Sequence, residues 1–102
     1  MVYVDAERNQ FGRMVMCHMF ADTIAELHDM AAKIGMKRKW FQPFSFPHYD
    51  VALARRAAAV RCGAIEVDRR AGHEIRKRLR TDEAFMAEWK EAFKAHCAET
   101  TK

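Results

Sequence analysis

The order of apolar and polar positions predicts two strands at the start of the chain. Residues 1–5 alternate, with Val2 and Val4 on one side, which is typical of a short strand. Residues 13–20 are apolar at nearly every position, which is typical of a strand buried on both faces. The link of residues 6–12 is too short for a parallel crossover, so we expect an antiparallel hairpin.

A first helix is predicted to begin at Thr23. Thr23 and Glu26 form a capping box, with Asp22 immediately before it. The apolar residues at helical spacing are Ile24, Leu27, Ala31 and Ile34, and Gly35 supplies a left-handed stop.

The middle of the chain predicts a third strand and a second helix. Residues 37–42 predict the strand, and residues 43–50, which contain both prolines, predict an irregular loop. Asp50 is placed to cap the helix, which ends at Gly63. Its expected inward positions are Leu53, Ala57 and Val60.

The last third of the chain predicts one more strand and two helices. Residues 64–68 form the strand, with Ile65 and Val67 on one face. A short helix follows around residues 72–80, and Thr81, Asp82 and Glu83 open a final helix. The inward stripe of that final helix is expected to be Phe85, Trp89 and Phe93.

The succession β-α-β-α-β defines the expected fold class. Such a succession implies parallel strands joined by right-handed crossovers. We therefore predict a small single-domain α/β protein with three parallel strands, an N-terminal antiparallel strand and C-terminal helices. Residues 1–80 are expected to form the α/β core, and residues 81–102 a C-terminal helical extension of the same domain.

Composition restricts the class of protein. The chain has 102 residues, of which 50% are hydrophobic and 31% charged, so it suits one modest core and neither a disordered nor a membrane protein. The acidic N-terminus does not resemble a secretory signal, so we expect a cytoplasmic location. Cys17, Cys62 and Cys97 form no C-x-x-C pair, which disfavours a disulfide framework or a zinc knuckle.

Charge is distributed unevenly along the chain. Residues 31–80 hold thirteen Lys and Arg against four acids, a net charge of +9, whereas residues 1–30 carry −3 and residues 81–102 carry −2. This asymmetry favours an anionic partner, either nucleic acid or a phosphorylated small molecule. The alternative is that these charges form only the solvated faces of helices.

A ligand site is predicted at the edge where the parallel strands would end, because open α/β sheets bind ligands there. His48 and Asp50 are the candidates for acid-base catalysis. The candidate ligand-binding residues at the same edge are Asp22, Thr23, Tyr49, Asp68, Arg69 and Arg70. Asp22 and Asp50 have an alternative role as helix caps.

Basic residues next to aromatic ones suit single-stranded nucleic acid, through phosphate contacts and base stacking. The candidate nucleic-acid-binding residues are Lys37, Arg38, Lys39, Arg55 and Arg56, with Trp40 and Phe41 beside the first three. On a strand, Trp40 and Phe41 would point to opposite faces, so at least one of them is expected in the core.

Metal binding and nucleophilic catalysis have weaker support. His18, His28, His48 and Asp50 are suitable ligand types, but no two of them have the i, i+4 or H-x-H spacing of a strong metal motif, so no metal site is predicted. His18 is instead expected to be buried and hydrogen-bonded, and Asp5 has no predicted place in a site. Ser45 lacks a G-x-S-x-G turn, and the sequence has no Walker or dinucleotide glycine pattern, so any cofactor stays unknown.

A set of short motifs resembles one known family. The motifs are Y-V-D at 3–5, H-M-F-A-D at 18–22, E-L-H at 26–28, W-F-Q at 40–42, H-Y-D at 48–50 and G-A-I-E-V at 63–67. Together they resemble the domain of unknown function number 4031, over residues 1–70. The resemblance implies a compact α/β unit of bacterial or phage origin, and it implies no activity. The terminal helix at 82–98 lies outside the resemblance.

Three functions remain open from the sequence. The leading hypothesis is a cytoplasmic protein that binds nucleic acid or a nucleotide-like phosphate at the predicted edge. The first alternative is a small hydrolase or metal-assisted enzyme that uses His48 and Asp50. The second is a phage-type interaction regulator that forms a homodimer or binds a partner through Phe85, Trp89 and Phe93.

Overall fold

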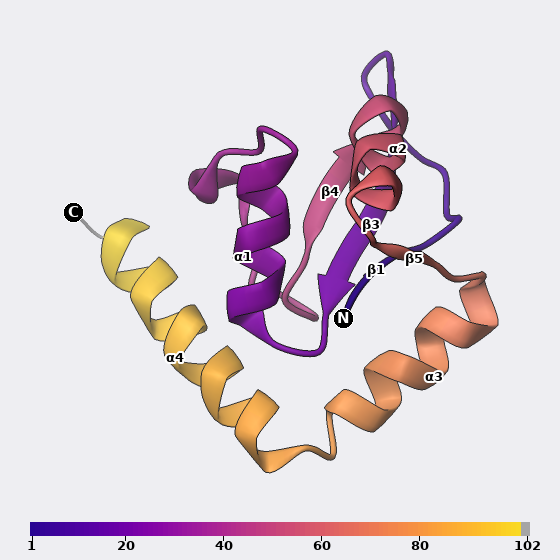
Figure 1. Ribbon diagram of the computed structural model, residues 1–102. Coiled ribbons are helices and arrows are strands. Elements are labelled where there is room, and N and C mark those ends of the chain that lie inside the picture. Colours follow the sequence, from indigo (N-terminus) through magenta and orange to yellow (C-terminus); the bar gives the residue numbers. More distant parts are fainter. Residues whose placement is uncertain (101–102) are drawn as a thin grey trace.

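A mixed β-sheet crosses the middle of the protein, with its longest strand at the centre (Figure 1). The structure is a computed structural model that describes residues 1–100, apart from the side chains of residues 11, 99 and 100. The central strand β3 (Met14–Ala21) pairs antiparallel with β1 (Val2–Val4), β2 (Asn9–Phe11) and β4 (Tyr49–Ala52). The short strand β5 (Ile65–Glu66) pairs parallel with β1.

The register of β3 fixes the strand order. Met16 lies opposite both Asn9 of β2 and Ala52 of β4, so β2 and β4 occupy opposite edges of β3. Met19 likewise lies opposite both Val4 of β1 and Tyr49 of β4. β1 and β2 therefore share one edge of β3, and β4 has the other edge to itself.

The chain bulges between β1 and β2. Val4 lies opposite Met19, whereas Asn9 lies opposite Met16, so five steps along one strand match three along the other. The two extra residues fall within positions 5–8. A bulge of this kind redirects side chains, and here it brings two acidic side chains toward β3, as described below.

Within residues 1–100, four α-helices surround the sheet. They are α1 (Ile24–Lys33), α2 (Leu53–Arg61), α3 (Arg69–Leu79) and α4 (Glu83–Thr100), and a 3₁₀ turn, η1 (Arg38–Trp40), follows α1. In Figure 1, α3 and α4 form a V below the sheet. The Thr23 hydroxyl accepts a 3.1 Å hydrogen bond from the backbone amide of Glu26 and so caps α1. Gly35 has a φ of 78° just after α1, a conformation that glycine adopts without strain.

The two faces of the sheet are buried to different extents. One face is covered by α1 and α2 and forms the larger core, which includes Val4, Cys17, Met19, Tyr49 and Val51, all fully buried. The other face is covered only in part. Its aromatic half packs Tyr3 and Phe20 against Phe46, Leu79 of α3 and Phe85 of α4. The remaining half carries His18 and Asp50 and borders the cavities described below.

Several expected elements are confirmed. Residues 1–5 and 13–20 contain antiparallel strands, helix α1 has the predicted cap and stop, and α2 ends before Gly63. The fold is a small α/β domain. The three parallel strands are wrong, however, because β1 and β5 form the one parallel pair among the described strands. The first hairpin partner of β3 is β2, which the sequence did not predict.

The expected third strand at residues 37–42 is also wrong. Residues 38–40 form η1, and Lys37 to Lys39 are exposed, since this basic segment has no apolar alternation that would bury one face of a strand. Gln42 makes an isolated bridge to His48 instead. The next strand is instead β4, which pairs antiparallel with β3. The connection from β3 through α1 to β4 is therefore not a crossover between parallel strands.

The expected details of α2 and α3 need correction. Asp50 is a residue of β4 and does not cap α2, whose N-cap Ala52 makes no side-chain hydrogen bond. Leu53 is 44% exposed and Ala57 is exposed, because α2 turns Ala59 into the core instead. The predicted inward residue Val60 does pack against the core and is partly buried. Helix α3 begins at Arg69 rather than near 72, since Asp68 accepts from the Ala71 amide and caps it there.

Helix α4 contributes part of its aromatic stripe to the core of this chain. Phe85 is buried, Trp89 packs against Phe46, and Phe93 is 41% exposed beside Phe44. The homodimer through this helix and the division of the chain at residue 80 stay predictions. Residues 101–102 of the predicted extension lie outside the described residues. Within the described chain, no helix combines the length and apolarity that crossing a membrane requires.

His28 makes the stability of this core depend on pH. Its ring packs 4.7 Å from the Phe41 ring, and its Nδ1 lies 2.7 Å from the Tyr49 hydroxyl. Burial, with a further contribution from Arg38, lowers the pKa of His28 to about 4. Below its ordinary pKa of 6.5 the unfolded chain takes up a proton that the folded chain refuses, so stability falls as pH falls toward 4.

Between pH 7 and pH 5, His28 is expected to reduce the free energy of unfolding by about 2 kcal/mol. Urea denaturation of the wild type and of His28→Gln at both pH values measures this contribution as the difference between their pH dependences. An NMR titration of the His28 ring gives its pKa directly. An equal loss of stability in both proteins would contradict the assignment.

Candidate functional site

Three strands bring Asp5, His18 and Asp50 side by side. Asp50 of β4 lies directly opposite His18 of β3, and the Asp5 amide donates to the His18 carbonyl at 3.0 Å from the other edge. Residues directly opposite one another in a sheet project from the same face. The three side chains therefore form a row across the partly covered face of the sheet.

Asp5 is fully buried, and every contact of its carboxylate is a hydrogen bond. Oδ1 accepts from the backbone amides of Glu7 at 3.2 Å and His18 at 2.9 Å, and Oδ2 lies 2.8 Å from Nδ1 of His18. Burial raises the pKa of Asp5, but the hydrogen bonds from His18 outweigh it, so the pKa lies below its usual value. The bond to Asp5 conversely raises the pKa of His18, against the opposing effect of burial.

His48 reaches the same row from the loop before β4. The backbones of His48 and Gln42 exchange hydrogen bonds of 3.0 and 2.9 Å, which fix the loop end. The ring Nδ1 donates to the Phe46 carbonyl at 2.5 Å, and Nε2 lies 3.4 Å from Oδ1 of Asp50. The rings of His48 and His18 are 5.3 Å apart and nearly perpendicular. Gln42 also donates from Nε2 to Oδ2 of Asp50 at 2.6 Å.

A small basic cavity lies on one side of this row. Its volume is about 210 Å³, and its lining includes Glu7, His18, His48, Arg76 and Arg80. Arg76 lies in the last turn of α3 and Arg80 is its C-cap, so the two arginines are about one helical turn apart. The Arg76 guanidinium lies 5.1 Å from the centre of the Phe20 ring, and that of Arg80 lies 5.1 Å from the centre of Phe46. These aromatic rings hold both cations in place.

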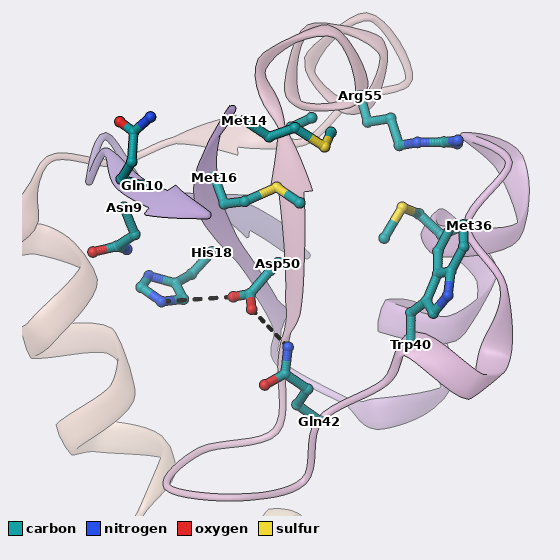
Figure 2. Close-up of a pocket in the computed structure, with 11 residues that line it drawn as sticks. Asn9, Gln10, Met14, Met16, His18, Met36, Trp40, Gln42, Asp50 and Arg55 are labelled. Carbon is teal, nitrogen blue, oxygen red and sulfur yellow. Dashed lines mark hydrogen bonds and ion pairs between the residues drawn. The ribbon is translucent and has the colours of Figure 1, made fainter. Parts of the chain in front are cut away.

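A larger and mostly apolar cavity lies on the other side. Its volume is about 660 Å³, and its apolar lining includes Met14, Met16, Met36 and Trp40. Figure 2 shows the His18 ring and the Asp50 carboxylate facing each other, while Trp40 and Met36 line a different part of the cavity. His18 lines both cavities. The row of polar side chains therefore separates a cationic compartment from an apolar one.

The predicted catalytic pair does come together, but Asp22 and Thr23 lie elsewhere. Asp22 follows His18 by four residues, which is about 13 Å along an extended strand. Its carboxylate accepts from the Tyr3 hydroxyl at 3.0 Å and from Arg78 at 3.2 Å. Thr23 serves as the cap of α1.

The other predicted ligand-binding residues have structural or exposed positions. Tyr49 is fully buried on the opposite face of the sheet, beside His28. Asp68 caps α3, and Arg69 and Arg70 are exposed in its first turn. The arginines that do reach His48 come from the second half of α3. The spacing of four between Arg76 and Arg80 was the available signal, but its use required knowing where α3 begins.

The predicted nucleic-acid residues divide into two groups. Lys37, Arg38 and Lys39 are exposed around η1, and the Lys37 ammonium lies 5.6 Å from the centre of the Trp40 ring. The other two support the fold. Arg55 donates to the Ile34 carbonyl at 2.8 Å. Arg56 donates to the Asp5 carbonyl and to Glu66, both at 2.8 Å.

Sequence reasoning missed Asp5, His18 and Glu7 as site residues. Glu7 Oε2 lies 3.1 Å from Nδ1 of His18, and the bulge between β1 and β2 makes that approach possible. The available signals were a carboxylate at the end of an apolar strand and a histidine within one. Neither signal reveals that β1 and β4 pair with opposite edges of the same strand.

The fold and the site define a class of protein: a small mixed-sheet α/β domain with a histidine-carboxylate row between two cavities. Residues 2–81 match the family described as protein of unknown function (DUF4031), so the chain belongs to that family. Neither a curated protein nor a solved structure matches the chain.

Asp5→Ala is expected to lower the free energy of unfolding by about 3 kcal/mol. The substitution leaves two backbone amides and Nδ1 of His18 without their buried acceptor. Urea denaturation measures the loss. The control Glu91→Ala, at a side chain that is 76% exposed, should stay within about 0.5 kcal/mol of the wild type. Equal stabilities for the two variants would contradict the role of Asp5.

Proposed function

We propose that this chain is a small cytoplasmic protein that binds a nucleotide-like phosphate ligand across the two cavities. The observation that carries the proposal is the position of His18, which lines both the small cationic cavity and the large apolar one. A nucleotide has the same division, with an anionic phosphate at one end and an apolar, planar base at the other. The free cysteines suit a reducing compartment.

The small cavity supplies the phosphate subsite. Arg76 and Arg80 carry two guanidinium groups, which suit phosphate oxygens through paired N–H donors. Among the ion pairs of the described residues, none includes Arg76 or Arg80, and both side chains line the cavity. Arg80 donates one hydrogen bond to the Ser45 carbonyl at 3.2 Å, which leaves its other N–H groups for an anion. Glu7 also lines this cavity, but its carboxylate already pairs with Nδ1 of His18.

The large cavity supplies the base subsite. Its volume of about 660 Å³ lies within the range of small-molecule sites, roughly 300–1,000 Å³. Trp40 is 39% exposed and offers an aromatic surface for stacking. Gln10 and Gln42 add side-chain amides that can hydrogen-bond to a base edge.

The exposed basic segment beside Trp40 allows the ligand to be longer than one nucleotide. Lys37, Arg38 and Lys39 lie at η1, next to the proposed base subsite. Each phosphate contact of a lysine or arginine makes binding weaker as salt concentration rises. The number of nucleotides bound is therefore measurable from the salt dependence of the affinity for a mononucleotide and for a short single-stranded oligonucleotide.

The double substitution of Arg76→Gln and Arg80→Gln is expected to weaken binding of a nucleoside 5′-monophosphate at least 10-fold. Each guanidinium contributes charge-assisted hydrogen bonds to the phosphate, worth about 1.5–3 kcal/mol apiece. Isothermal titration calorimetry measures the affinity. The matched control replaces Arg69 and Arg70 by Gln, which removes the same charge from the exposed start of the same helix.

Two further binding measurements test which cavity holds the phosphate and which holds the base. Trp40→Ala should weaken binding of the nucleotide while leaving binding of inorganic phosphate unchanged. If the variant of Arg76 and Arg80 binds as tightly as the variant of Arg69 and Arg70, the cationic cavity is not the phosphate subsite. If neither probe binds the wild type, the proposal fails.

A phosphoester hydrolase is the second candidate, and the Asp5–His18 pair favours it. A carboxylate 2.8 Å from Nδ1 orients the imidazole, as a base in acid-base catalysis requires. His48 lies beside it on the wall of the phosphate subsite. His18 and His48 would then divide the roles of base and acid during attack of water on the phosphorus.

If the protein is a hydrolase, His48→Ala should lower the turnover number at least 100-fold, because positioned acids and bases contribute about 10²–10⁴-fold. Phosphate release from a nucleoside monophosphate, or release of the chromophoric alcohol from a chromogenic phosphodiester, measures turnover. The melting temperature should change by a few degrees at most, since His48 lies in a loop at the edge of the cavity. Unchanged turnover in the variant would assign any hydrolysis to a contaminant.

A further inference from the structure

Three potential metal ligands converge although His18 lies at least 30 residues before the other two in the sequence. His18 comes from β3 and Asp50 from β4, directly opposite one another, and His48 comes from the loop that the Gln42 bridge closes. One ligand atom from each side chain lies within 4.8 Å of the other two. The sequence predicted no metal site because no two of these residues have the i, i+4 or H-x-H spacing of a strong metal motif. The register of the sheet supplies the proximity instead.

Both histidines turn the same nitrogen toward Asp50. Nδ1 of His18 is held by Asp5, whose carboxylate also accepts two backbone amides. Nδ1 of His48 must donate, because its partner, the Phe46 carbonyl, only accepts. A neutral imidazole that carries its proton on Nδ1 presents a lone pair on Nε2. Carboxylate and carbonyl partners behind the ring are what orient histidines at metal centres.

The distances between ligand atoms fit a tetrahedral ion. Metal–ligand bonds of 2.0–2.1 Å at tetrahedral angles place the ligand atoms about 3.3 Å apart. Nε2 of His48 lies 3.4 Å from Oδ1 of Asp50, and Nε2 of His18 lies 3.8 Å from the same oxygen. The second separation exceeds the tetrahedral value by about 0.5 Å, so binding of an ion requires a small approach of the His18 ring. The second oxygen of Asp50 is occupied by the amide of Gln42 at 2.6 Å, which fixes the orientation of the carboxylate.

We propose that His18 Nε2, His48 Nε2 and Asp50 Oδ1 form a site for a divalent transition-metal ion, with Zn²⁺ as the best match. Two imidazoles and one carboxylate favour Zn²⁺ or Fe²⁺ over Mg²⁺ and Ca²⁺, which prefer oxygen ligands. Three protein ligands leave a fourth position open, as in catalytic zinc sites. That position lies between the two cavities, because His18 lines both of them.

A second cluster of potential ligands, on the other side of the His18 ring, is a poorer candidate for a metal site. Asp5, Glu7 and His18 also bring three ligand atoms together. Their shared nitrogen, however, is Nδ1 of His18, which already lies 2.8 Å from Asp5 and 3.1 Å from Glu7. Asp5 is fully buried and spends both oxygens on hydrogen bonds within the fold. This group therefore orients His18, and the ion belongs on the other side of the ring.

The test uses the full chain without an affinity tag, stripped by a chelator and titrated with Zn²⁺ and separately with Co²⁺. We expect one ion per chain by calorimetry, and for Co²⁺ the intense visible absorption of a four-coordinate ion. Asp50→Asn and His48→Ala should each weaken Zn²⁺ binding at least 100-fold. Gln42→Ala, which releases the carboxylate without removing a ligand, should weaken it about 10-fold.

Two controls separate this site from other ligands. His73→Ala removes an exposed histidine of α3 and should leave the affinity unchanged. Cys62→Ser removes an exposed thiol, which is the alternative soft ligand, and should also have no effect. Circular dichroism confirms that each variant is folded. Wild-type affinity in both Asp50→Asn and His48→Ala, or binding lost in Cys62→Ser, would overturn the proposal.

The probe is the metal ion alone, so the result does not depend on the proposed nucleotide ligand. Zn²⁺ binding without nucleotide binding would retain the metal site and reject the two-cavity ligand. If the protein binds nucleotide equally well with and without the chelator, and does not bind Zn²⁺, the two-cavity ligand is retained and the metal site is rejected.

Discussion

The buried carboxylate of Asp5 is the constraint on which the rest of the arrangement depends. A charge taken out of water has to be compensated by hydrogen bonds, and Asp5 finds three, from the amides of Glu7 and His18 and from the His18 ring. These three hydrogen bonds require the chain to bulge after β1, and they fix the rotation of the His18 imidazole. Arg56 donates to the carbonyl of the same residue and so ties α2 to this point. The fold and the site thus share one anchor.

Local signals were sufficient for some elements and not for others. Helix α1 was predictable because its cap and stop, Thr23 and Gly35, lie within the segment itself. The strand at β4 was not, since a residue such as Asp50 looks like a helix cap until its pairing partner His18 is known. Parallel order was inferred from the alternation of elements alone. Alternation does not determine direction when a strand returns along the free edge of the central strand.

The residues of the candidate site likewise include some that local signals predict and some that they do not. His48 and Asp50 were predictable because they are two residues apart, directly after Pro47. Asp5 and His18 depend on which strands pair, and Arg76 and Arg80 depend on where α3 begins, which Asp68 decides. Arg69 and Arg70 were chosen because they follow a strand directly. The arginines two turns later are the ones that reach His48, because Phe20 and Phe46 lie beneath their side chains.

Helix α4 lies beyond residues 2–81, the part of the chain that matches the family, yet it acts on the loop that carries His48. Trp89 donates from Nε1 to the Pro43 carbonyl at 2.6 Å, and its ring packs 5.4 Å from that of Phe46. Ordering a loop costs conformational entropy, about 1–2 kcal/mol for each residue held. In this protein, the contacts with α4 order the loop when the chain folds. A chain limited to the matched region would lack these contacts with Pro43 and Phe46, so other interactions would have to order the loop that carries His48.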